Sequence, residues 1–153
     1  MGLISFIKNA GAKIFGKIET EAPVEEAKTL QANALLNHVN KLGLTYKKIN
    51  IEITGEKVKV LGEVETQEDV EKIILAIGNV EGVGSVDNYL RVVLPTPEAQ
   101  FHTVVSGDTL SKIAQNFYGS ANKYPVIFEA NKPMLTHSDK IYPGQVLRIP
   151  AEG

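Results

Sequence analysis

A six-residue segment, Leu94 to Ala99, constrains the fold of this chain more than any other feature. It reads LPTPEA, and its prolines at positions 95 and 97 fix φ and lack backbone N–H groups. Neither a helix nor a central strand runs easily through such a segment, which is typical of a stiff linker. The chain has 153 residues, enough for one ordinary domain or two small ones. We therefore predict two small domains, at residues 1–93 and 100–150, joined by a linker at residues 94–99.

The first eighteen residues have apolar side chains at helical spacing. The expected apolar face consists of Leu3, Ile4, Ile7, Ala10, Ile14, Phe15 and Ile18. Lys8, Lys13 and Lys17 surround it, so a helix here either packs on the domain that follows or lies on an anionic membrane surface. We favour packing, the commoner cause of such a pattern. Polar residues interrupt the apolar run, so we expect neither a cleaved signal peptide nor stable membrane insertion.

The remainder of the first domain changes from helical periodicity to alternation and back. A helix is predicted over residues 24–42, followed by strands near 49–53 and 58–62 around the turn 54–56. Thr66 and Asp69 form a weak capping box for a second helix that ends at Gly78, and a strand follows over 86–93. The predicted class is α+β, with an N-terminal helix before an αββαβ unit. Of the other polar residues, we interpret His38 as a hydrogen-bonded core residue. We interpret the acidic run as a solvated face; it comprises Glu63, Glu65, Glu68, Asp69 and Glu71.

The last fifty residues predict a strand, two helices and a strand. The first strand covers 101–105, and Asp108 is the expected N-cap of the helix that follows. The second helix lies near 123–130 and the last strand at 146–150. The apolar residues expected to face inward from the two helices are Leu110, Ile113, Ala114, Phe117, Tyr124, Ile127 and Phe128.

Three blocks in this second part, at residues 102–114, 127–131 and 141–150, resemble the LysM domain. The first block reads HTVVSGDTLSKIA and the last reads IYPGQVLRIP. The resemblance implies a groove that binds polymers of N-acetylglucosamine, between the loop before the first helix and the loop before the last strand. The matching positions in this chain are Gly107, Asp108, Thr109, Leu110 and Ile141.

The first part resembles a BON domain, on its hairpin, Gly62, the helix 69–77 and the loop 78–83. A BON domain followed by LysM, with the opening MGLISFIKNAG, resembles the bacterial cytoplasmic potassium-binding proteins over nearly the whole chain. That resemblance implies selective potassium binding, a structural response to the ion, and main-chain oxygens as its ligands. Carried over position by position, it implies the carbonyls of Ile7, Ala10, Gly78, Val80 and Val83.

The residues at these positions are compatible with potassium. The ion is large and singly charged, and neutral carbonyls replace its water shell better than a carboxylate cluster, which favours divalent ions. A helix ending at Ile77 or Gly78 leaves unpaired carbonyls at the negative end of its dipole. Glycine spacing alone is better explained by a helix C-cap and a turn, so only the whole-chain resemblance carries the ion hypothesis.

Composition narrows the remaining classes of function. The chain has no cysteine, which excludes thiolate chemistry and disulfides, and its formal net charge of −2 argues against a general nucleic-acid binder. The three histidines are scattered, and no catalytic motif is present. We therefore expect a monomeric, cytoplasmic, non-enzymatic protein that binds K⁺. The alternative is an envelope protein that binds peptidoglycan- or chitin-type glycans through its LysM domain.

Overall fold

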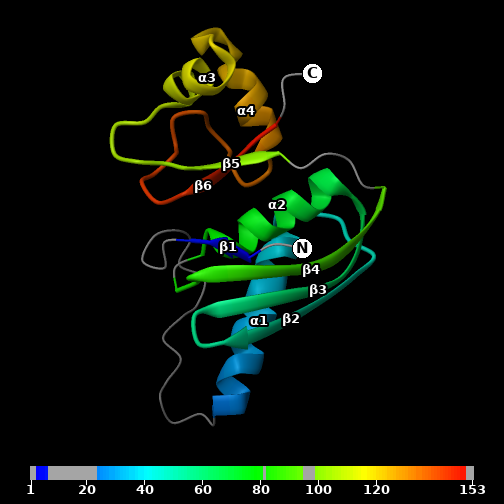
Figure 1. Ribbon diagram of the computed structural model, residues 1–153. Helices are drawn as coiled ribbons and strands as arrows, with labels where there is room; N and C mark the ends of the chain where they lie inside the picture. Colours follow the sequence, from blue (N-terminus) through cyan, green and yellow to red (C-terminus); the bar gives the residue numbers. More distant parts are fainter. Residues whose placement is uncertain (1–2, 7–23, 81, 95–98, 151–153) are drawn as a thin grey trace.

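The computed structural model describes residues 3–6, 24–80, 82–94 and 99–150 (Figure 1). Its helices and strands mix in both parts of the chain, which confirms the α+β class. In chain order they are β1 (Leu3–Ser5), α1 (Val24–Lys41), β2 (Lys48–Thr54), β3 (Lys57–Thr66), α2 (Gln67–Gly78), β4 (Ser85–Leu94), β5 (Gln100–Thr103), α3 (Leu110–Tyr118), the 3₁₀ helix η1 (Ala121–Lys123), α4 (Tyr124–Ala130) and β6 (Val146–Ile149).

A four-stranded sheet in the order β1-β4-β3-β2 forms the base of the first domain. β2 and β3 pair antiparallel around Gly55, whose φ of +64° suits the tight turn. β3 and β4 are parallel and are joined by the crossover helix α2. Thr66 caps α2 as predicted, because its Oγ1 accepts a hydrogen bond from the Asp69 N–H at 3.1 Å.

Side chains alternate between the two faces of β3, and one set of them points into a core. Side chains of α1 and α2 belong to the same core. Leu35 and Val39 of α1 and most of α2 are buried there. The fully buried large side chains of this cluster include Leu35, Val39, Val58, Val60, Ile73, Ile74, Leu75 and Ile77. Figure 1 shows α2 lying between this sheet and the β5–β6 ribbon, so one helix faces both domains.

The N-terminus differs from the sequence prediction. Residues 3–5 form the strand β1, paired antiparallel with β4, and Leu3 lies opposite Asp87. The predicted start of a helix at Leu3 is therefore wrong, because β4 offers an unpaired strand edge and the local helical pattern does not account for that partner. Residues 7–23, which hold the rest of the predicted helix, lie outside the described residues.

The second domain has a two-stranded antiparallel sheet of β5 and β6, covered by α3, η1 and α4. The predicted order of strand, helix, helix and strand is confirmed, with η1 as an addition. Its separate core consists of Val104, Leu110, Ile113, Ala114, Ile127, Leu135, Leu147 and Ile149. Among the described residues, no helix is long and apolar enough to cross a membrane.

Three details of the second domain correct the sequence prediction. Thr109, not Asp108, caps α3, since its Oγ1 accepts from the Lys112 N–H at 3.1 Å. The Asp108 carboxylate instead accepts from the Val105 N–H at 3.0 Å and contacts the His102 ring at 2.9 Å, which closes the turn one residue earlier. Phe117 and Tyr124, both predicted to face inward, are 38% and 39% exposed. Phe117 packs edge-on against the His102 ring, so the small core is completed without it.

Candidate functional site

The C-terminus of α2 and the loop after it bring together three of the five predicted ion ligands. The Val83 N–H donates to the Val80 carbonyl at 3.1 Å, so the loop folds back immediately after the helix. The side chains of Val80 and Val83 are buried in the core. At both positions, therefore, a ligand could contact the main chain but not the side chain. The sequence prediction concerns these main-chain oxygens.

Gly78 is the last residue of α2, as predicted, but the physical reason for a glycine differs. Its φ is not positive, and Asn79, also with a negative φ, caps the helix. A Cβ atom placed at Gly78 would instead overlap the ring of Phe6. The absence of a side chain therefore lets the N-terminal segment pack directly on the end of α2.

The loop between α2 and β4 is fixed on two sides by main-chain hydrogen bonds. The Gly84 N–H donates to the Glu56 carbonyl of the β2–β3 turn at 2.8 Å, and the Gly84 carbonyl accepts from the Phe6 N–H at 2.9 Å. Gly82, with φ of +102°, supplies the left-handed residue that the reversal requires. Gly84, at the end of this loop, is thus bonded to the turn on one side and to the N-terminal segment on the other.

Ile7 and Ala10, the other two predicted ligands, lie outside the described residues, as does the predicted helix break at Gly11. Ile7 directly follows Phe6, whose buried ring contacts Gly78. The N-terminal segment therefore reaches the end of α2, and the structure describes this segment as far as Phe6.

The electrostatics of this region favour a cation. The carbonyl end of α2 carries the negative end of the helix dipole, and the last turn holds no basic side chain. Within the described ranges, no three His, Cys, Asp or Glu residues group together in a way that could hold a metal ion. Neutral main-chain oxygens are a donor set suited to potassium rather than to calcium or magnesium.

Asn79 joins the end of α2 to the second domain, a contact that sequence reasoning missed. Its side chain is buried, at 6% exposure. The Nδ2 group donates to the Val146 carbonyl at 2.8 Å, and Oδ1 accepts from the Val146 N–H at 2.8 Å. This carboxamide therefore pairs with β6 as a neighbouring strand would. No local signal marks Asn79, because its partner is 67 residues away in the chain.

A second buried contact between the domains lies along α2. Glu71, with a side chain 3% exposed, forms an ion pair with Arg148 of β6 and accepts from the Ala99 N–H at 2.9 Å. The Gln67 side chain donates to the same carboxylate at 3.3 Å. The predicted solvated acidic face is therefore wrong at Glu71, because α2 presents this side to the second domain rather than to water.

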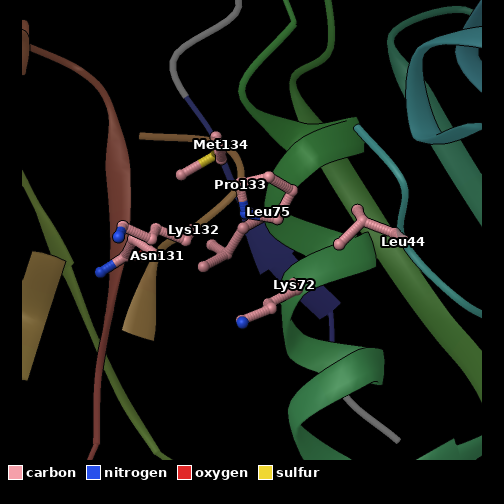
Figure 2. Close-up of a pocket in the computed structure, with 7 residues that line it drawn as sticks. All are labelled: Leu44, Lys72, Leu75, Asn131, Lys132, Pro133 and Met134. Carbon is pink, nitrogen blue, oxygen red and sulfur yellow. The ribbon is translucent and has the colours of Figure 1, made fainter. Parts of the chain in front are cut away.

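A narrow cleft lies beside these contacts, lined by Leu75 and Lys72 of α2, Leu44, and residues 131–134. Figure 2 shows these residues, contributed by α2 on one side and by the segment after α4 on the other. The cleft encloses only about 10 Å³, room for about one water molecule. It is a narrow gap in the packed interface between the domains rather than a ligand site.

The predicted glycan residues have mostly internal roles. Leu110 is buried in the second core, and Ile141 packs against that core. The Gly107 carbonyl accepts from Lys112 Nζ at 3.1 Å, and Asp108 and Thr109 close the turn and cap the helix as described above. Much of the hydrogen-bonding capacity of this loop is therefore used within the loop itself.

Known proteins resemble this chain over its whole length. A BON domain model matches residues 16–93, and a LysM domain model matches residues 102–150. The potassium binding protein Kbp of Escherichia coli O6:H1 is 47% identical over 153 residues, which cover 99% of this chain and 100% of that protein. The chain belongs to the Kbp family. An uncharacterized protein of Deinococcus radiodurans is 32% identical over 131 residues, which cover 78% of this chain and 51% of that relative.

The match to the Kbp family covers both parts of the fold described above. The BON match contains the α2–β4 loop, and the LysM match contains β6, so the Asn79–Val146 and Glu71–Arg148 contacts join the two matched regions. The Escherichia coli relative is named for potassium binding.

Proposed function

We propose that this chain binds potassium and holds it with main-chain carbonyl oxygens at the end of α2. The observation that carries the proposal is the 47% identity, over the full length of both chains, to a protein named for potassium binding. The proposed ligands are the carbonyls of Gly78, Val80 and Val83, with those of Ile7 and Ala10 from the N-terminal segment.

The geometry supports carbonyls as ligands. The loop closes on itself through Val80 and Val83, whose side chains are committed to the core, and the N-terminal segment packs on Gly78. Carbonyl oxygens beyond the last helical N–H lack partners within the helix and lie at the negative end of its dipole. A large monovalent ion with weakly held water is the cation best matched to several such neutral oxygens.

We further propose that ion binding is coupled to the docking of the LysM domain. Asn79 lies between two proposed ligands, Gly78 and Val80, while its side chain holds Val146 of β6. A shift of the main chain that improves the carbonyl geometry at Gly78 therefore changes the hydrogen bonds to β6. This arrangement would make the protein a potassium sensor or buffer whose two domains respond together. We also propose that it acts as a cytoplasmic monomer, with domains at residues 1–93 and 100–150.

Thermal unfolding in KCl and in NaCl at equal ionic strength tests the proposal. Binding to the folded state alone stabilises it, by about 2.7 kcal/mol at a hundredfold excess over Kd, so the midpoint should be higher in KCl. Identical midpoints in the two salts would contradict potassium binding.

Two glycine variants locate the effect. Gly78→Val should remove the difference between the salts, because its side chain displaces Phe6 and distorts the proposed ligands. Gly119→Ala is the matched control, since it strains a left-handed residue in the second domain with no neighbour within 4 Å. It should lower both midpoints and keep their difference.

Glycan binding is less well supported, because the loop 107–110 uses much of its hydrogen-bonding capacity internally and Leu110 is buried. Titration with chitin oligomers, followed by NMR at Thr109 and Ile141, measures it directly. Saturable shifts at both positions would restore this alternative.

A further inference from the structure

A cavity of about 300 Å³ lies between the two domains and shares the lining residue Met134 with the narrow cleft. Its walls come from α1 through His38 and Leu42, from α2 through Ala76 and Asn79, and from the segment between α4 and β6. That volume lies at the lower end of the range for small-molecule sites. The cavity is therefore large enough for an organic molecule of roughly ten to fifteen heavy atoms.

Gln145, one of the residues that line the cavity, carries an unsatisfied polar group. The Gln145 side chain is 3% exposed, and its Oε1 meets no hydrogen-bond donor in the described part of the chain. A buried acceptor without a partner is destabilising, so such groups call for an explanation. Rotation about the terminal bond of the side chain is easy and can turn the carboxamide towards a donor inside the cavity.

The charge of the walls favours an anion. Among the described lining residues none is acidic, whereas Lys140 contributes an ammonium group at the rim. Burial, and secondarily the charge of Lys41, lowers the pKa of His38, which therefore remains neutral at physiological pH. Burial raises the pKa of Tyr142 to about 12, so its phenol keeps the proton and remains able to donate a hydrogen bond.

The rest of the wall is apolar. Leu42 and Ala76 face the cavity from the first domain, and Met134 and Leu135 face it from the second. A ligand that fits both kinds of wall carries its charge at the Lys140 rim and an apolar group deeper, against these side chains.

We propose that this cavity binds a small organic acid with an apolar substituent and a hydroxyl or amino hydrogen. Lys140 attracts the carboxylate, Gln145 accepts the hydrogen of the hydroxyl or amino group, and Tyr142 donates to the ligand. None of the five predicted glycan residues lines this cavity, although the loop before the last strand borders both the cavity and the predicted LysM groove. The site is also separate from the proposed potassium ligands, although Asn79 borders both.

Three matched probes test the proposal on the full chain in excess KCl. 3-Phenyllactate carries the charge, the hydroxyl and the apolar ring; 3-phenylpropionate lacks the hydroxyl; 3-phenyllactamide lacks the charge. We expect saturable NMR shifts at the amides of Thr136, Lys140 and Gln145 with 3-phenyllactate. The other two probes should bind about tenfold more weakly, the effect of one lost hydrogen bond or charge contact.

Protein variants provide the second arm. Gln145→Met keeps the length of the side chain and removes its acceptor, so it should weaken 3-phenyllactate about tenfold and leave 3-phenylpropionate unchanged. Lys140→Gln should weaken both acids and leave the amide unchanged. Lys48→Gln, at an exposed position of β2, is the matched charge control and should change nothing.

The proposal is overturned if 3-phenyllactate produces no shifts at the three amides. Equal affinity for all three probes would also overturn it, because the cavity would then select only for apolar character. The comparison among probes needs no mutation, so it remains decisive even if Gln145→Met fails to fold.

Discussion

At the scale of a single residue, Gly78 satisfies two structural requirements. It ends α2, where the main chain turns into the loop, and it leaves room for the ring of Phe6. A helix stop alone would accept several residues, but contact with an aromatic ring accepts only glycine here. The contact also determines where the N-terminal segment meets the end of α2.

Gly78→Ala should therefore destabilise the protein by about 1–3 kcal/mol, the usual cost of overpacking a core. Phe6→Ala in the same chain should recover part of this loss relative to the sum of the two single variants, because it removes the overlap. Urea unfolding of the four proteins measures the coupling. Additive effects would show that Gly78 is required for another reason.

His38 predicts a pH dependence. Burial, then the charge of Lys41, lowers its pKa from the ordinary value of 6.5. The unfolded chain then binds a proton more readily than the folded chain, so stability is full above pH 6.5 and falls as the pH drops from 6.5 towards the lower pKa of the folded state.

His38→Gln should remove this contribution. The loss of unfolding free energy between about pH 7.5 and about pH 5.5 should be smaller in the variant than in the parent chain. Urea titrations at the two pH values provide the measurement. An equal loss in both proteins would assign the pH dependence to other groups.

At the scale of the element, β6 is a short strand with both edges occupied. β5 pairs with one edge, and two asparagine carboxamides bond the other, Asn79 at Val146 and Asn131 at Arg148. Asn131 bonds both main-chain groups of Arg148, at 2.7 and 2.9 Å, and also the Ile127 carbonyl at 2.7 Å. A two-stranded sheet is marginal alone, so these side chains replace a missing third strand.

Asn131→Leu should destabilise the second domain by about 2–4 kcal/mol, since it leaves buried main-chain groups of Arg148 and Ile127 without their partner. Hydrogen exchange at the Arg148 amide should accelerate more than at Leu147, whose main chain faces β5. Uniform acceleration across β6 would instead indicate global unfolding.

At the scale of the molecule, α2 serves both domains at once. Its apolar face packs into the first core, while Glu71 and the Asn79 cap bind β6. The Glu71–Arg148 pair is almost entirely removed from water, unlike the Glu68–Lys72 pair one turn away on the same helix. Relative placement of the domains therefore depends on polar groups that are satisfied only when the two meet.

Glu71→Gln should cost about 3 kcal/mol, because it leaves Arg148 and the Ala99 N–H with a weaker partner. Glu68→Gln, which removes the exposed pair on the same helix, should cost no more than about 0.5 kcal/mol. Small-angle scattering should show looser association of the domains in Glu71→Gln only. Equal stability losses would mean that the buried pair does not hold the domains together.

Sequence reasoning predicted most of the elements and few of the contacts between them. The bounds of α1 and α2, the β2–β3 hairpin and the Thr66 cap follow from local periodicity and capping chemistry, so the sequence contained them. The strand β1 was not predicted, because the apolar spacing of residues 3–7 suits a helix and the competing partner, β4, is at least 80 positions away. The loop brings Gly78, Val80 and Val83 together, but their role as ion ligands stays a prediction, as does that of Ile7 and Ala10.

The sequence by itself determined the α+β class, the order of the elements and the resemblance to a known family. These depend on local preferences and on motifs that can be read along the chain. Tertiary structure alone decided what Gly78, Asn79 and Glu71 do, because each of them contacts a partner far away in the sequence. A glycine that makes room for a ring, and a carboxamide that pairs with a distant strand, carry no local signature.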